Sequence, residues 1–188
     1  MNAMNSQFAR SEFKLLYLTI MNIELKATYV KMLQKMIDIE NQLVRYLPRM
    51  GENTTDPGLG DVIAKHTREI TLQRDRIREI LLQHRIPTGV ERNEVFEKFL
   101  GDMEDDMLRI SDNNVRDSFI ISTMQMIKHI RISKYNTLVE WADFLRESED
   151  KNLLQMTLHE EETINKKFST LAEQSLLTVE NMREFVTQ

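Results

Sequence analysis

Apolar residues recur every three or four positions over most of the chain, the spacing that places them on one face of an α-helix. Clusters rich in Pro, Gly, Asp, Asn and Ser interrupt this pattern and mark helix ends. The pattern predicts five helices, with one further amphipathic segment near each terminus. The expected bounds are 24–47, 60–85, 91–110, 114–147 and 151–174, and the additional segments lie near 11–22 and 178–186.

Few residues favour tight turns, since 188 residues include only five Gly and three Pro. A many-stranded sandwich or barrel needs more of them. A helix of about 24 residues is about 36 Å long, so four of the expected helices can pack side by side. We predict one all-α domain over 1–188, an antiparallel four-helix bundle with 91–110 as an additional crossover helix and an N-terminal helical extension.

Composition and charge exclude several classes of function. The chain has no Cys, which rules out disulfides, thiolate nucleophiles and Cys-ligated metal centres. Its net charge of −5 argues against a nucleic-acid partner. The longest apolar stretch, 13–25, contains Lys14, Asn22 and Glu24 and is too short and too polar to span a bilayer. We therefore expect a cytoplasmic protein without a signal peptide or a membrane partner.

All four bundle helices carry polar residues in the middle of the apolar face. Glu40 is flanked one turn away on both sides by Met36, Ile37, Leu43 and Val44. A carboxylate there cannot easily reach water, and its unpaired burial would be very costly. A single interior polar residue is ordinarily a satisfied core residue, but four helices with the same feature predict a shared cluster. Its expected members are Glu40, His66, Glu69, Gln73, Arg131, Glu161 and Asn165.

Carboxylates and histidines that face the interior of a helical bundle are the usual ligands of a di-metal centre. Glu40, Glu69, Glu161 and His66 offer such groups. Arg131 departs from that pattern, because a guanidinium in the middle of an apolar face is unusual. No phosphate-binding loop, zinc-protease motif or nucleophile–base arrangement indicates another chemistry.

Three stretches carry a resemblance to a known family. The first is Met-Leu-Gln-Lys-Met-Ile-Asp-Ile-Glu-Asn-Gln-Leu at 32–43, followed by Leu-Pro-Arg-Met at 47–50. The others are Ile-Lys-His-Ile-Arg-Ile-Ser-Lys-Tyr at 127–135 with Thr-Leu-Val-Glu-Trp-Ala at 137–142, and Thr-Leu-His-Glu-Glu at 157–161. Over about 24–175 the chain resembles the YciE/YciF family of ferritin-like stress proteins. The resemblance implies a ferritin-like fold, a role in bacterial stress responses, dimers and a di-metal site.

The chain departs from this family at the residues that matter most for a metal. The family's two glutamates in its Glu-His-Tyr-Glu segment are Lys128 and Arg131 here, and an aspartate of the last helix is Asn165. Each change to a cation removes a ligand and adds repulsion toward a metal ion. We infer that Arg131 substitutes for the metal, with its five donors bridging Glu40, Glu161 and Glu69. His129 is expected to face elsewhere.

Three functions remain open. The first is a non-catalytic ferritin-like protein with a degenerate di-metal site, no cofactor and a structural or interaction role in stress. The alternative is a di-metal oxidoreductase or iron-handling protein that holds iron or manganese. Its ligands would be Glu40, His66, Glu69, Glu160 and Glu161. The third is a binding module that uses a second apolar side of the 114–147 helix, although such a side is usually buried. This side consists of Phe119, Ile121, Met126, Ile130, Ile132 and Phe144.

The N-terminal segment carries an apolar strip outside the family-like core. A strip of this kind needs cover, so we predict a homodimer or a larger homo-oligomer. The alternative is that the segment docks along its own bundle. The strip consists of Phe8, Phe13, Leu16, Tyr17, Ile20 and Ile23.

Overall fold

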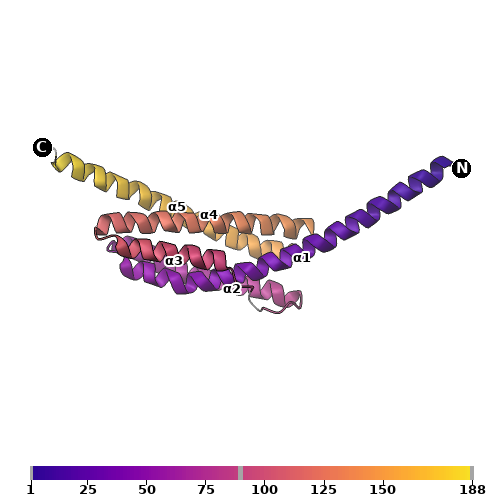
Figure 1. The fold of residues 1–188 in the computed structure, drawn as a ribbon, viewed down its shortest axis with the longest axis horizontal. Helices are drawn as coiled ribbons and strands as arrows, with labels where there is room; N and C mark the ends of the chain where they lie inside the picture. Colours follow the sequence, from indigo (N-terminus) through magenta and orange to yellow (C-terminus); the bar gives the residue numbers. More distant parts are fainter. Residues whose placement is uncertain (1, 89–90, 187–188) are drawn as a thin grey trace.

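The computed structural model describes residues 2–88 and 91–186, and side chains over 12–14, 16–88 and 91–175. Within these residues the chain forms α-helices and no strands, as predicted (Figure 1). The helices are α1 (Asn2–Asn53), α2 (Pro57–Gln83), α3 (Glu94–Arg109), α4 (Asn113–Phe144) and α5 (Ser148–Val186).

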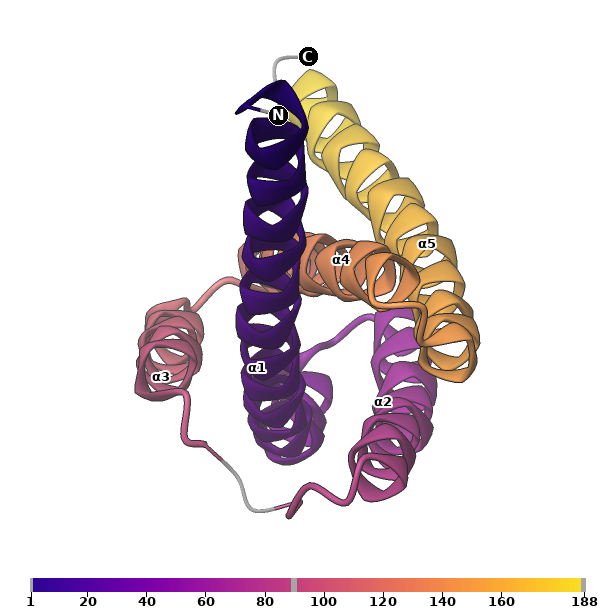
Figure 2. The ribbon, with the colours of Figure 1, turned by 90° about the vertical axis from the view of Figure 1, so that its right-hand side faces the viewer.

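The core is a four-helix bundle in which α1 packs closely on α2, and α4 on α5. α3 connects the second and third bundle helices and lies on the outside, against α1 and α4 (Figure 2). The predicted four-helix bundle with a crossover helix is therefore confirmed. Its interior is filled by buried aliphatic and aromatic side chains from all five helices.

The clusters that interrupt the apolar pattern cap helices. Asp56 accepts a hydrogen bond from the Leu59 N–H, and Pro57 follows it as the first residue of α2. Asp112 caps α4 in the same way through the Val115 N–H. A left-handed residue follows both α2 and α4, and it is an arginine in each case: Arg85 has φ 58° and Arg146 has φ 61°.

Several helix bounds differ from those expected. The 11–22 and 24–47 segments form one helix, because no helix-breaking residue separates them. α1 also continues through Pro48 to Asn53. A proline there removes one backbone hydrogen bond, but buried Leu47 and Met50 keep the final turns against the bundle. The 151–174 and 178–186 segments are likewise continuous within α5.

The beginning of α1 projects beyond the bundle, at the end opposite to the one from which the end of α5 projects (Figure 1). Residues 12–24 form what we call the α1 arm, in which every described side chain but Met21 is exposed. No described helix is sufficiently long and apolar to cross a membrane.

Candidate functional site

A buried ionic cluster occupies the centre of the bundle, where side chains from the four long helices meet. None of its side chains is exposed to solvent. We use the name ionic cluster for Glu40 of α1, His66 and Gln73 of α2, Lys128, Arg131 and Tyr135 of α4, and Glu161 of α5.

Arg131 bridges three helices. Its Nη2 donates to both carboxylate oxygens of Glu40, at 2.9 and 2.8 Å. Nη2 also donates to Gln73 Oε1 at 2.7 Å, and Nη1 lies 2.5 Å from Glu161 Oε2. Only arginine has a planar set of donors that can contact α1, α2 and α5 at once.

Lys128 lies one turn before Arg131 and contacts the same carboxylate. Its Nζ donates to Glu161 Oε2 at 2.8 Å, the oxygen that Arg131 also contacts. The ammonium also contacts His66 Nε2. Two cationic side chains therefore lie between α2 and α5, in the middle of the bundle.

Tyr135 completes the contacts of Glu40 by donating its hydroxyl proton to Oε1 at 2.7 Å. The side chain of Glu40 thus has a cation on both oxygens and a hydroxyl donor on one. Burial still raises the pKa of Glu40 above its ordinary value, despite the opposing effect of Arg131. Burial and Glu40 together raise the pKa of the Tyr135 hydroxyl well above its usual range.

His66 is neutral at physiological pH. Burial, and then the neighbouring Lys128, lower the pKa of His66 to about 4. Its Nε2 accepts from the ammonium of Lys128, so the ring proton belongs on Nδ1. That nitrogen faces Glu69 Oε2 at 3.6 Å, which is longer than a hydrogen bond.

Lys128 and Glu161 each affect the pKa of the other. Burial lowers the pKa of Lys128 to about 7, although Glu161 opposes this effect. Burial would raise the pKa of Glu161, but Arg131 and Lys128 lower it to about 2. Glu161 is therefore an anion at physiological pH, paired with Arg131.

The structure brings together five of the seven residues expected in this cluster: Glu40, His66, Gln73, Arg131 and Glu161. Glu69 instead lies at the edge, with its side chain 29% exposed, and the contacts of Arg131 do not include it. Asn165 is half-buried, and its Oδ1 has no hydrogen-bond partner among the described residues.

Glu160, a ligand in the metal-binding alternative, lies at the edge of the cluster and contacts Gln73 among its members. Its carboxylate accepts from Arg76 through two nitrogens at 2.7 Å each, and from Gln73 at 3.0 Å. His129 is exposed on the far side of α4.

Sequence reasoning did not include Lys128 and Tyr135 in the cluster. Both have a simple signal, because they lie three positions before and four positions after Arg131 and so share its helix face.

A pair of divalent ions does not fit this set of side chains. Both oxygens of Glu40, Oε2 of Glu161 and Nε2 of His66 already contact Arg131 or Lys128. Glu161 Oε1 is the only carboxylate oxygen of Glu40 and Glu161 without a hydrogen bond in the described structure. A metal would need to displace the amine of Lys128 and the guanidinium of Arg131, which are both fully buried, and repulsion from the guanidinium opposes its entry.

A family model described as a domain of unknown function (DUF892) matches residues 24–180. This chain belongs to the DUF892 family. No curated protein matches. The predicted similarity to YciE/YciF proteins is thereby confirmed at the level of family and fold.

Solved structures share the DUF892 fold of this chain. The Escherichia coli stress protein YciF superposes with a TM-score of 0.76 at 23% identity, covering 81% of this chain and 96% of that one. YcfI, a putative structural protein from Rhodopseudomonas palustris, gives 0.75 at 23% identity, covering 78% and 93%. A protein from Xanthomonas campestris gives 0.67 at 16% identity, covering 85% and 99%. At these identities the likeness shows the fold.

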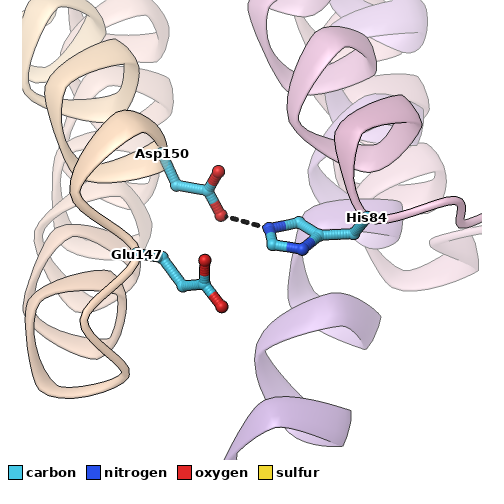
Figure 3. A group of neighbouring side chains, drawn as sticks. All are labelled: His84, Glu147 and Asp150. Atoms are coloured by element: carbon cyan, nitrogen blue, oxygen red, sulfur yellow. Dashed lines mark hydrogen bonds and ion pairs between the residues drawn. The ribbon is translucent and has the colours of Figure 1, made fainter.

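A second polar cluster of this DUF892 protein joins the beginning of α5 to the end of α2 and lies beside α1. His84, Glu147 and Asp150 place one ligand atom each within 4.8 Å of one another (Figure 3). His84 Nε2 lies 2.7 Å from Asp150 Oδ2, which also accepts from the Tyr29 hydroxyl at 2.8 Å. Lys26 Nζ, 2.5 Å from Glu147 Oε1 and 3.3 Å from His84 Nδ1, is the cation of this group.

Proposed function

We propose that this chain is a non-catalytic, cytoplasmic member of its family, with a structural or interaction role in a stress response. In this proposal Arg131 and Lys128 replace the metal ions of a di-metal site and hold the four helices together. The observation that carries the proposal is the position of Arg131, whose guanidinium contacts Glu40, Gln73 and Glu161 from three different helices.

The chemistry of the cluster supports a structural role. The carboxylate oxygens of Glu40 and Glu161 that a metal ion would need are largely taken up by contacts with Arg131 and Lys128. A substrate would also need to reach the cluster, yet the side chains of Glu40, His66 and Arg131 have no exposed surface. The names of the similar structures, a stress protein and a putative structural protein, agree with this proposal.

One metal-binding experiment tests both this proposal and the alternative with iron or manganese. The unmodified protein, purified without chelator and offered Mn²⁺, Fe²⁺ or Zn²⁺, is expected to hold no stoichiometric metal and to melt at an unchanged temperature. Lys128→Glu with Arg131→Glu would place two carboxylates where the two cations lie. Because a ligand of the native state stabilises it by mass action, Mn²⁺ should then raise the melting temperature of this variant.

The matched control reverses two charges on the surface of α5, with Lys166→Glu and Lys167→Glu, and should gain no metal response. If the unmodified protein already takes up metal, and Glu40→Ala abolishes the uptake, the proposal fails and the metal-binding alternative replaces it.

A further inference from the structure

The α1 arm presents a row of large apolar side chains to solvent. Phe13, Leu16, Ile20 and Ile23 are 73, 59, 49 and 64% exposed. Their spacing of three, four and three residues is that of the a and d positions of a coiled coil, and Ala27 continues it. The arm therefore carries a seam suited to a partner helix.

This seam faces away from the protein's own bundle. Tyr29 of α1 is fully buried in the core, and Ile20 lies nine residues before it. At about 100° per residue, nine residues place the two side chains on opposite sides of the helix. The arm also leaves the bundle at the end opposite to the projecting part of α5 (Figure 1). Among the described residues, therefore, no other helix lies beside the seam on which the arm could dock.

We propose that the seam binds the same seam of a second copy of this chain, with the two α1 arms antiparallel. The order of side chains is symmetric about position 18. An antiparallel pair centred there places Leu16 against Ile20 of the second copy, and Phe13 against Ile23 of the second copy.

Charges beside the seam favour the antiparallel orientation. With Phe13 and Ile20 at a positions, Glu12 and Lys26 are at g positions. In the antiparallel pair Glu12 lies opposite Lys26 of the second copy. A parallel pair would instead place Lys26 against Lys31. Lys26 already contacts Glu147 of its own chain, and Glu12 adds a second carboxylate to the same ammonium.

The family model begins at residue 24, so the seam residues from 13 to 23 precede the region shared with the family. The paired arms are thus a feature of this chain's own extension. They do not depend on what the ionic cluster binds, and the two proposals can fail separately.

Sedimentation of the full chain at tens of micromolar tests the interface. The unmodified protein should sediment as a dimer or a multiple of one. Leu16→Glu, which places a carboxylate at the centre of the seam, should halve the mass while leaving helicity and melting of the bundle unchanged. The control is Leu82→Glu, which changes a leucine of similar exposure on α2 and should not change the mass. A monomeric unmodified protein would overturn the proposal, whether its arm then folds back on its own bundle or binds added lipid vesicles. A Leu16→Glu protein with the same mass as the unmodified protein would also overturn it.

Disulfide trapping tests the orientation, because the native chain has no cysteine. Phe13→Cys and Ile23→Cys chains should cross-link when mixed under oxidising conditions, and the product should contain one chain of each kind. Neither variant alone should cross-link. In a parallel pair each variant would cross-link with itself, and that result would overturn the antiparallel arrangement.

Discussion

Arg131 Nη2 lies within 2.9 Å of both carboxylate oxygens of Glu40, and neither side chain has any contact with solvent. Removing two charges from water is expensive, and the cost is recovered only when geometry is good and the remaining donors and acceptors are satisfied. Here Arg131 also contacts Gln73 and Glu161, and Glu40 also accepts a hydrogen bond from Tyr135. The four helices are consequently tied together through polar contacts at the point where apolar packing is interrupted.

Removing the guanidinium should be strongly destabilising. Arg131→Ala leaves Glu40 buried without its cation, so we expect a loss of about 3–5 kcal/mol in the free energy of unfolding. Urea denaturation followed by circular dichroism measures it. The control Arg109→Ala breaks only an exposed pair with Asp106 and should change stability by about 0.5 kcal/mol or less.

Replacing the guanidinium together with both carboxylates should cost much less than removing the guanidinium alone. In Arg131→Leu with Glu40→Leu and Glu161→Leu, no carboxylate is left without its guanidinium. The amine of Lys128 remains, but burial has already lowered its pKa to about 7, so it can stay neutral in the apolar core. If the triple variant is less stable than Arg131→Ala, the contacts of the cluster contribute more than its desolvation costs. If Arg131→Ala leaves the free energy of unfolding unchanged, that result would contradict the burial of Arg131.

The hydroxyl of Tyr135 offers a comparison within the same core. It donates to Glu40, whereas the buried hydroxyl of Tyr46 has no hydrogen-bond partner in the described structure. Tyr135→Phe should therefore cost about 1.5–3 kcal/mol, the range for hydrogen bonds to charged groups. Tyr46→Phe removes an unsatisfied polar atom and should be neutral or stabilising. Equal effects of the two substitutions in chemical denaturation would show that the Glu40 contact contributes nothing.

His66 should make the protein sensitive to mild acid. Its pKa falls from 6.5 to about 4 on folding, so between these values the unfolded chain binds a proton that the native protein does not. The free energy of unfolding is therefore unaffected by His66 above about pH 6.5 and decreases as the pH falls below it, by about 3 kcal/mol at pH 4.

Urea denaturation at intervals from pH 7 to pH 4 measures this dependence. His66→Gln should flatten it, whereas His129→Gln, which changes an exposed histidine on α4, should not. If both variants keep the slope of the unmodified protein, His66 is not the group that titrates.

The fold and the cluster differ in how far the sequence predicts them. Helical periodicity and scarce turn residues predicted the bundle, and polar residues such as Glu40 and Arg131, set in apolar faces, predicted which side chains meet at its centre. Helix ends were less predictable, because arginines at 85 and 146 take the left-handed conformation that glycine usually marks. The second cluster was also missed. Its residues lie at helix ends and in a loop, where His84 and Glu147 belong to no apolar stripe.

Asp150 should be the most sensitive residue of that second cluster. Its buried carboxylate accepts from the Tyr29 hydroxyl at 2.8 Å and lies 2.7 Å from His84 Nε2, so it links α1, the end of α2 and the first turn of α5. Asp150→Ala leaves both partners without an acceptor and should cost about 2–4 kcal/mol. Asp150→Asn keeps one acceptor oxygen and should cost less. Asp143→Ala breaks only an exposed pair with Lys151 and serves as the control.

The same substitution should also loosen the base of the arm. Because Tyr29 is the first residue of α1 that is fully buried beyond the arm, loss of its hydrogen bond to Asp150 should increase amide hydrogen exchange over residues 25–33. Unchanged exchange there, together with unchanged stability, would mean that apolar packing of Tyr29 and Leu33 alone fixes the base of the arm.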